Sequence, residues 1–361
     1  MQLGASYRIG QTSSNLYVAG YSAGAKYINA RPSEVVIGSA TTQLFRNLSL
    51  ALKFEPGDEL VLSNLDHEAN VASWVYIAQI EKLTVKWWPV DKESTSPKLT
   101  PEALKEVMSE KTRLVACTHA SNILGTIHDV KGMADVVHGY PRALFCVDGV
   151  AYAPHRRIDV KALDVDFYCF SWYKVYGPHV AQLYASEKAQ KEMRSLGHYF
   201  NPSTTLENKL ALAGANYELT QAIPTVTEYL TREGLSEGII EHEGALQKIL
   251  LDCLNSKPDI TVWGEKTSDP DVRVPTVSFT VKGKSSTAIV EAIEAKSNYG
   301  LRNGHMYSHR LVTTILNGGK GLSEEGVIRC SMVHYNTGMM TLAYLRVLDV
   351  GRDVGGHVYR C

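Results

Sequence analysis

Buried strands and amphipathic helices alternate in the middle of this chain. Three short apolar runs rich in β-branched and aromatic residues cover 112–122, 142–155 and 165–174, and apolar residues at helical spacing cover 99–111 and 129–139. Short apolar runs of this kind are typical of buried strands, and a spacing of three or four residues is typical of helices packed against them. The alternation predicts an α/β fold with a mainly parallel sheet.

Local signals mark where several of these elements begin and end. Thr100 precedes Pro101, an arrangement that favours a helix beginning at Pro101, and the second helical stretch ends on Gly139. Upstream, residues 32–54 and 58–79 each run from a strand-like segment through a polar turn into a helix with apolar residues at regular spacing. The first half of the chain is therefore expected to repeat a strand–turn–helix plan.

The character of the sequence changes after about residue 205. Two long helical patterns are followed by three strand-like segments, at 206–223, 237–256, 260–264, 274–283 and 327–336. We therefore expect a large α/β domain over residues 1–235 and a smaller α+β domain over residues 236–361.

The composition of the chain limits the kinds of molecule that it is expected to bind. The 361 residues are 44% hydrophobic and carry a formal net charge of -1, so neither nucleic acid nor an anionic membrane is expected as a main partner. No apolar stretch is long enough to span a bilayer and the first ten residues lack the core of a signal peptide, so we expect a soluble, cytoplasmic protein. The six cysteines form no C-x-x-C pair, which favours inert thiols in a reducing compartment and argues against a zinc site.

Polar side chains follow several predicted strands at the point where each strand ends. In open parallel sheets ligands bind outside the carboxyl ends of the strands, so these residues are candidates for one common site. They are Thr41, Thr42, His67, His119, Asn122, Asp148, Ser171 and Lys174. Taken singly they carry little information, because an aspartate in a turn or a lysine at the surface is common.

Asp148 and Lys174 form the most informative pair, because they end successive strands. A carboxylate can hold a protonated ring nitrogen and an amine can form a Schiff base, and a pyridoxal phosphate enzyme needs both groups. The phosphate of that cofactor needs hydroxyls and N–H groups at the start of a helix, and the segment 39–43 supplies both. The alternative is a structural salt bridge or two unrelated surface groups.

The segment from Asp148 to Lys174 resembles the class V aminotransferase family, in particular its cysteine desulfurase-like branch. Four further segments resemble motifs of the same branch in the same order, at 66–74, 118–126, 175–179 and 329–337. The resemblance implies pyridoxal 5'-phosphate as cofactor, an amino acid as substrate, and a homodimer with interfacial active sites. It also implies fold type I of the PLP-dependent transferases, with a seven-stranded, mainly parallel sheet between helices. Within the branch, the motifs are most similar to those of enzymes of the loline-biosynthesis type.

The resemblance also implies a role for each matching residue. Lys174 matches the Schiff-base lysine, Asp148 matches the partner of the ring nitrogen, and His67 matches a catalytic histidine that stacks on the cofactor. The other cofactor contacts are expected at Asn122, Thr41, Thr42, Ser171 and Tyr173. Arg329 matches the arginine that grips the α-carboxylate of the substrate, and His305 is expected as a second substrate contact.

The loop at 302–308 departs from the desulfurase pattern. Desulfurases carry R-x-G-H-x-C, whose cysteine accepts sulfur, and Tyr307 stands in the place of that cysteine. A tyrosine cannot carry a persulfide and Cys330 lies within a strand pattern, so desulfurase activity of the usual kind is not expected. Tyr307 either packs this loop or acts in catalysis by shaping the pocket or moving a proton. Tyr173 and Ala151 likewise replace a histidine and a glutamine of the desulfurases.

Three functions follow from these observations. The first, which we favour, is a bond-forming cyclase or lyase of specialised metabolism that acts on an amino acid through an external aldimine and a Cα carbanion. The second is a C–S lyase or an atypical cysteine desulfurase, which cysteine-dependent release of sulfide would reveal. The third is a non-catalytic scaffold, suggested by Gly214–Ala215 in place of the family's Gly-Thr pair. The intact set of Lys174, Asp148 and Arg329 argues against a scaffold.

Overall fold

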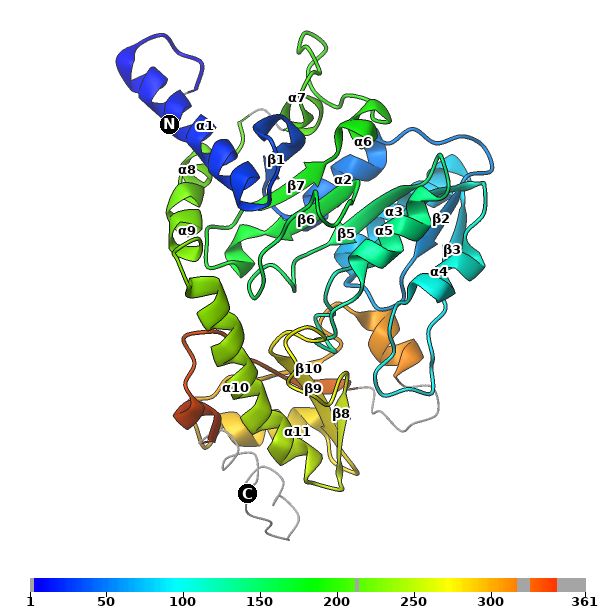
Figure 1. Ribbon diagram of the computed structural model, residues 1–361, viewed down its shortest axis with the longest axis vertical. Coiled ribbons are helices and arrows are strands. Elements are labelled where there is room, and N and C mark those ends of the chain that lie inside the picture. Colours follow the sequence, from blue (N-terminus) through cyan, green and yellow to red (C-terminus); the bar gives the residue numbers. More distant parts are fainter. Residues whose placement is uncertain (1–2, 212–213, 317–324, 343–361) are drawn as a thin grey trace.

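The computed structural model describes residues 3–211, 214–316 and 325–342. Figure 1 shows a large sheet with its helices in the upper half of the molecule and a smaller sheet with further helices in the lower half. The long helix α10 (Leu235–Asn255) runs down one side into the lower half. The boundary predicted at 235/236 falls on the first residues of this helix, and its role as a domain boundary stays a prediction.

The large sheet has seven strands in the order β1-β7-β6-β5-β4-β2-β3. Only β7 runs against its neighbours, so the prediction of a mainly parallel sheet is confirmed. The carboxyl ends of the other strands therefore open to one edge of the sheet. The bounds are β1 (Val35–Gly38), β2 (Glu59–Leu62), β3 (Thr84–Trp87), β4 (Thr112–Thr118), β5 (Leu144–Asp148), β6 (Phe167–Ser171) and β7 (Ala181–Ala185).

Helices cover both faces of the large sheet, as the continuous apolar strands require. Along β4, Val115 packs in one core cluster and Leu114 and Ala116 pack in the other, because successive side chains point to opposite faces. The first cluster lies under α1 (Arg8–Tyr27), α4 (Pro101–Val107), α5 (Val130–His138) and α9 (Ile223–Leu230). The second lies under α2 (Thr41–Ala51), α3 (Ala72–Glu81), α6 (Glu187–Lys191) and α7 (Leu206–Leu210).

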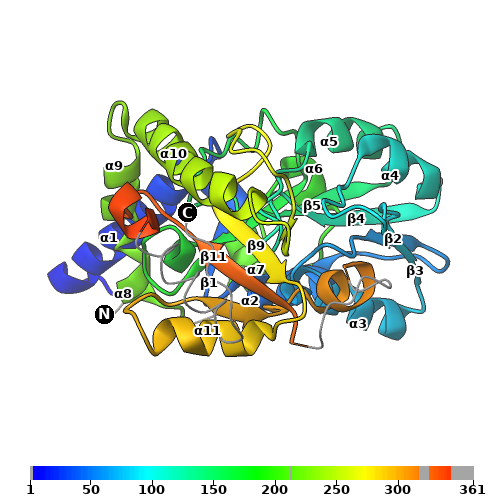
Figure 2. The same ribbon diagram turned by 90° about the horizontal axis from the view of Figure 1, so that it is seen from below.

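The small sheet has four strands in the order β10-β11-β9-β8, and every neighbouring pair is antiparallel. Figure 2 shows β9 and β11 beside the helices α10 and α11. Phe279 of β9 packs in the cluster under these helices, whereas its neighbour Ser278 points the other way and donates a hydrogen bond to the carbonyl of Ile123. One face of the small sheet is thus directed at the large sheet. The bounds are β8 (Ile260–Trp263), β9 (Thr276–Val281), β10 (Arg302–Gly304), β11 (Val327–Ser331) and α11 (Ser286–Glu294).

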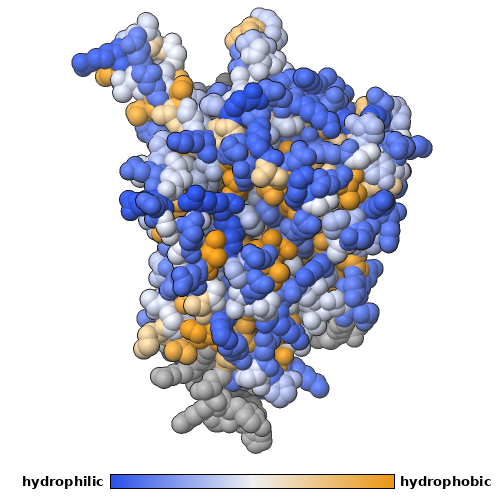
Figure 3. Space-filling view, viewed as in Figure 1, coloured by the Kyte–Doolittle hydropathy of each residue, from blue (hydrophilic) through white to orange (hydrophobic). Residues whose placement is uncertain are grey.

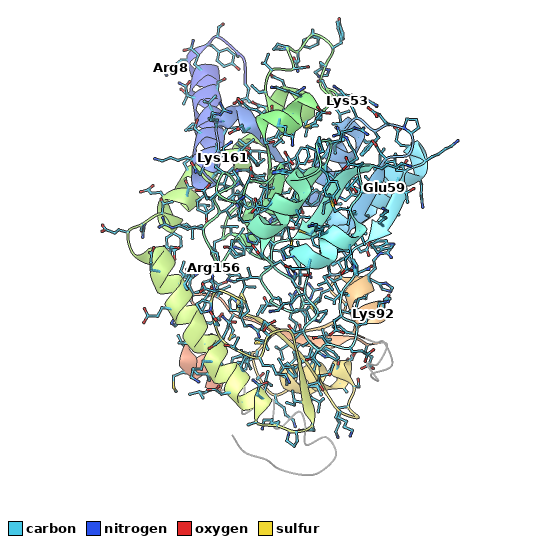
Figure 4. The ribbon with its side chains drawn as sticks, turned by 45° about the vertical axis from the view of Figure 1, so that its right-hand side comes forward. Arg8, Lys53, Glu59, Lys92, Arg156 and Lys161 are labelled. Atoms are coloured by element: carbon cyan, nitrogen blue, oxygen red, sulfur yellow. The ribbon has the colours of Figure 1, made fainter. Side chains whose placement is uncertain are left out.

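A buried charged cluster joins α10 to the loop that follows β5. The Glu243 carboxylate is fully buried, with one oxygen 2.9 Å from Nδ1 of His155 and the other 3.4 Å from Nη1 of Arg156. Figure 4 labels Arg156, which lies where the two halves of the molecule meet. Its guanidinium also donates to the carbonyls of Pro270 and Arg273, so one side chain ties three segments together.

Several local predictions are confirmed and one is wrong. The Thr100 side chain accepts a hydrogen bond from the Ala103 N–H and caps α4 as expected. The predicted long helix over 206–223 is wrong, because only α7, the short α8 (Tyr217–Thr220) and the start of α9 form there. Ala211 ends α7 with extended backbone and Gly214 has a φ of 71°, so the helix cannot continue. Residues 212–213 lie outside the described residues.

Two further expectations concerned the cysteines and the absence of a membrane-spanning segment. Cys117, Cys146 and Cys169 are free and buried, as predicted for core thiols. Across the three described ranges, no helix combines the length and the apolar character that a membrane crossing requires.

Candidate active site

Two adjacent strands deliver Asp148 and Lys174 to the carboxyl edge of the large sheet. Asp148 is the last residue of β5 and lies opposite Cys169 of the parallel strand β6. After β6 the chain makes a single 3-10 turn, Trp172–Lys174, so the lysine projects just beyond the strand end. The Asp148 carboxylate accepts a hydrogen bond of 2.8 Å from the N–H of Val150, which fixes its orientation.

The pKa shifts of Asp148 and Lys174 suit the chemistry predicted for them. Burial raises the pKa of Asp148 to about 6, and the N–H of Val150 and the charge of Lys174 oppose that rise. Lys174 is open to solvent, yet its surroundings lower its pKa, first through partial desolvation and then through Arg329 and Arg302, while Asp148 opposes this change. The lysine therefore holds a larger neutral fraction than a free lysine, as an attacking amine or a base requires.

His67 presents a neutral aromatic ring to the same site. It caps the short turn Glu68–Asn70, because its Nδ1 accepts a hydrogen bond of 3.1 Å from the Ala69 N–H. Burial lowers its pKa to about 4, with further contributions from Lys174 and Arg329. An uncharged ring in this position is suited to stacking on a flat ligand.

The turn that carries Tyr307 is anchored above His67. The carbonyl of Tyr307 accepts a hydrogen bond of 2.8 Å from the Glu68 N–H, and its ring lies 5.2 Å from the ring of His67, measured between centroids. Asn122 holds the rest of the turn, because its Nδ2 donates to the carbonyl of Met306 at 3.1 Å and its Oδ1 accepts from the Ser308 hydroxyl at 2.7 Å. The side chain of Tyr307 itself remains 61% exposed at the mouth of the site.

The backbone of this turn is constrained. Tyr307 has a φ of 64° and Met306 a φ of 44°, values that residues with a side chain seldom adopt. The exposed His305 accepts a hydrogen bond of 3.2 Å at Nδ1 from the Tyr307 N–H. Two other segments, at Glu68 and Asn122, thus hold the turn in place. The predicted contact of Asn122 with the cofactor stays a prediction.

Arg329 reaches from the small sheet into the site. Its Nη1 donates a hydrogen bond of 2.8 Å to the carbonyl of Asn122, in the loop after β4, which aims the guanidinium at the large sheet. Its Nε is buried without a hydrogen-bond partner among the described residues. Burial, followed by the charge of Arg302, lowers its pKa to about 10, so the group is still cationic at neutral pH. A half-buried cation with a spare N–H is suited to binding a carboxylate.

The predicted phosphate end fits an anion. Thr41 and Thr42 begin α2, and the residue before them, Ala40, gives no side-chain cap, so the first N–H groups of the helix face outward. The hydroxyl of Ser171 is fully buried and has no hydrogen-bond partner among the described residues. Such a hydroxyl is costly to leave unpaired, which is consistent with a ligand oxygen as its partner.

Tyr173 occupies the position before the lysine. Its ring stacks on the ring of His179, with centroids 4.8 Å apart and planes 7° apart, and the Lys174 amine lies 5.7 Å from the centroid of the Tyr173 ring. The tyrosine therefore forms one wall beside the amine. Its predicted contact with the cofactor stays a prediction, as do the contacts of Thr41 and Thr42.

Two residues next to the site behave differently from the sequence expectation. Asp66 was missed, although it directly precedes His67: it is buried, accepts from Asn70 Nδ2 at 2.7 Å and from the Thr118 N–H at 3.0 Å, and burial raises its pKa to about 8. It ties the turn of His67 to the end of β4. His119, one of the candidates at the strand ends, has its Nδ1 2.8 Å from the Tyr168 hydroxyl and its ring stacked on that of Tyr152, and its role stays a prediction.

Comparisons with known proteins agree with this geometry. The family model described as "Aminotransferase class-V" matches residues 6–339. Aminotransferase-like protein FGM3 from Gibberella zeae is 56% identical over 339 residues, which cover 93% of this chain and 83% of that protein. Cysteine desulfurase-like protein ustD from Aspergillus flavus is 43% identical over 338 residues, which cover 91% of this chain and 76% of that protein.

The fold is also found among solved structures. The apo structure of a cysteine desulfurase from Thermococcus onnurineus NA1 superimposes with a TM-score of 0.85 at 21% identity, covering 96% of this chain and 86% of that one. Because the identity is this low, the likeness is informative about the fold alone. It confirms the predicted fold type, with its large, mainly parallel sheet and smaller C-terminal part.

Proposed function

The chain belongs to the aminotransferase class V family of pyridoxal phosphate enzymes, in its cysteine desulfurase-like branch, and we propose that it makes or breaks a bond at Cα or Cβ of an amino acid without a persulfide step. Within that proposal, a bond-forming cyclase or a lyase of specialised metabolism is the reaction we favour. The observation that carries it is the anchored turn in which Tyr307 replaces the sulfur acceptor.

The residues of the site fit the cofactor. Lys174 would hold its aldehyde end and Asp148 its ring nitrogen, while the ring of His67 would lie against its face. The phosphate would be held by Thr41, Thr42 and Ser171. When bound, pyridoxal phosphate supplies an electron-withdrawing ring that stabilises negative charge on the α-carbon of an amino acid.

The chain's own groups then have defined tasks. The carboxylate of Asp148 favours a protonated nitrogen in whatever heterocycle it contacts, because an opposite charge nearby stabilises the charged form. The lowered pKa of Lys174 makes its amine a readier carrier of a proton, because the neutral form is more populated than in a free lysine. Arg329 orients the substrate by binding its α-carboxylate, and the exposed Tyr307 closes the side of the site next to His67.

Neither Tyr307 nor Cys330 is suited to accept sulfur. Tyr307 has no thiol, and burial raises the pKa of Cys330 to about 12, although Arg329 opposes that rise, so the Cys330 thiol is protonated at neutral pH. Cys330 also lies within β11, in register with Val277 of β9, and not on a loop that could approach a substrate. A C–S lyase that releases sulfide directly remains the second candidate, because it needs no thiol acceptor.

Incubation with cysteine distinguishes the proposed reaction from an atypical desulfurase and from a C–S lyase. We expect that the holoenzyme forms no persulfide on the protein when it is incubated with cysteine, as measured by mass spectrometry of the intact chain with Cys330→Ser as matched control. We also expect that at least one amino acid other than cysteine is turned over. A persulfide of the wild-type chain that is lost in Cys330→Ser would contradict the proposal and establish an atypical desulfurase. Sulfide release without a persulfide would identify the C–S lyase.

We further propose that the chain forms a homodimer. Apolar side chains are exposed on α1 and on the loop between α6 and α7, namely Tyr7, Ile9, Leu16, Val18, Leu196, Tyr199 and Phe200. In Figure 3 apolar surface is visible on both of the corresponding projections at the top of the molecule. Apolar surface on projecting elements of a folded protein is typical of an interface between subunits.

Substitutions that place charged residues on α1 should weaken this dimer. The double substitution Ile9→Asp and Val18→Asp is expected to shift the protein from the mass of two chains to the mass of one at micromolar concentration, because it places carboxylates in an apolar contact. Analytical ultracentrifugation measures the shift, and the control is Gln79→Asp, which adds a carboxylate at an exposed position of α3. A wild-type protein that sediments as a single chain would overturn the proposal.

A further inference from the structure

A fully buried carboxylate lies on a helix outside the large sheet. Glu243 belongs to α10, which runs from the upper half of the molecule into the lower half (Figure 1). One of its carboxylate oxygens lies 2.9 Å from Nδ1 of His155, and the other accepts a hydrogen bond of 3.4 Å from Nη1 of Arg156. A buried charge is costly unless it is paired, and replacing a buried ion pair by apolar side chains is often neutral or stabilising. Stability alone therefore does not account for this cluster.

The turn between Asp148 and Arg156 connects this cluster to the candidate active site. At its start, the N–H of Val150 donates a hydrogen bond of 2.8 Å to the Asp148 carboxylate. The carbonyls of Gly149 and Tyr152 each accept two hydrogen bonds of 2.9–3.3 Å, from the N–H groups three and four residues further on. A continuous series of hydrogen bonds therefore runs from the carboxylate at the end of β5 to the buried carboxylate on α10.

The same cluster ties Arg156 to the segment that leads into the small sheet. The guanidinium donates hydrogen bonds of 3.2 Å to the carbonyl of Pro270 and 3.3 Å to the carbonyl of Arg273, and β9 begins at Thr276. Burial lowers the pKa of Arg156, and the charge of Glu243 opposes that fall. Without this carboxylate the buried cation would keep only carbonyl partners, and the turn would lose the contact that sets its position relative to α10.

We propose that Glu243 is a positioning residue for the candidate active site. By holding His155 and Arg156 it fixes the turn after β5, and through that turn it fixes the orientation of the Asp148 carboxylate. Glu243 acts through these two side chains and needs no contact of its own with a ligand. The inference rests on the proposed function, because it takes Asp148 as the partner of the ring nitrogen of pyridoxal phosphate.

Cofactor binding tests this role without relying on turnover. Kd for pyridoxal phosphate is measured by fluorescence titration of the cofactor-free protein at pH 8, above the pKa of about 6 that burial gives Asp148. Glu243→Gln keeps the size of the side chain and removes its charge. We expect it to raise Kd about 5–20-fold, because a charge-assisted hydrogen bond to the cofactor loses its orientation.

A double substitution distinguishes positioning from a structural role. In the Asp148→Asn background, Glu243→Gln is expected to change Kd by less than about twofold, because the charge that Glu243 orients is already absent. A structural role alone would raise Kd by the same factor in both backgrounds. Arg156→Lys is a milder change that keeps the charge but not the fork of N–H groups. It is expected to raise Kd by a smaller factor, again only where Asp148 is present.

A matched control measures the effect of breaking a comparable ion pair elsewhere. Glu192→Gln removes a carboxylate that pairs with the buried Arg113 at 2.9 Å, but this pair lies at the amino end of β4, away from the site. We expect it to leave Kd within about twofold of the wild type, and thermal unfolding verifies that each variant is folded.

Three results would overturn the inference and leave the proposed function intact. They are an unchanged Kd in Glu243→Gln, an equal rise in the wild-type and Asp148→Asn backgrounds, and an equal rise in Glu192→Gln. If the wild-type protein does not bind pyridoxal phosphate, the proposed function itself fails.

Discussion

Lys174→Ala is expected to lower turnover by roughly 10³-fold or more, because one substitution removes both an attacking amine and a base. The lysine is open to solvent and forms no salt bridge among the described residues, so its loss should not unfold the chain. The lowered pKa that suits the amine to proton transfer is lost with it. Initial-rate kinetics with the best substrate measure the effect.

A matched substitution shows that this loss is specific. Lys188 is exposed on α6, away from the site, and Lys188→Ala is expected to retain full activity. Borohydride reduction followed by peptide mass spectrometry should locate the covalently bound cofactor on Lys174 in the wild type and nowhere in Lys174→Ala. A variant that keeps more than about a tenth of the wild-type rate would contradict the role given to this lysine.

Asp148→Asn is expected to lower turnover by about 10²–10³-fold while the fold is preserved. An asparagine has nearly the same shape and its side-chain oxygen can still accept the hydrogen bond from the Val150 N–H. The substitution removes only the negative charge, which favours a protonated ring nitrogen in the cofactor. The variant should therefore also bind pyridoxal phosphate more weakly, as measured by fluorescence titration of the cofactor-free protein.

The pH dependence of this binding gives a second check. Burial raises the pKa of Asp148 to about 6 in the protein without ligand, so the wild-type carboxylate is ionised above that pH and becomes protonated below it. The difference in cofactor affinity between wild type and Asp148→Asn should therefore be largest above pH 6 and should narrow as the pH falls through 6. Affinities that differ by less than about threefold at pH 8 would contradict the assigned role.

The sequence predicted correctly those strands whose side chains are buried on both faces of the sheet. Val115, Phe145 and Phe170 lie in strands buried on both faces, so continuous apolar runs identified β4, β5 and β6. The polar residue at the end of such a run cannot continue the buried strand, which is why Asp148 and Lys174 could be assigned to one edge of the sheet. The roles of the remaining site residues came from the resemblance, because single histidines and threonines carry no such signal.

Other features depend on pairings between distant segments. Arg302 and Arg329 are separated by 26 residues in the chain, and only the strand register of the small sheet places them opposite each other. Asp66 looked like an ordinary turn residue because its partner Thr118 belongs to another strand. The stretch 206–223 has apolar residues at helical spacing, but α7 ends at Leu210 because the backbone of Ala211 is extended. The spacing of apolar residues does not predict such a local break.

The visible absorption spectrum of the purified protein, supplied with pyridoxal phosphate, tests the central claim most directly. If the chain is an amino-acid-processing enzyme of this family, the spectrum contains a band that is altered or lost in Lys174→Ala and that changes when its substrate amino acid is added. The absence of a Lys174-dependent band would contradict the account, as would a band that no amino acid alters. Either result would leave a protein that keeps the fold without the chemistry.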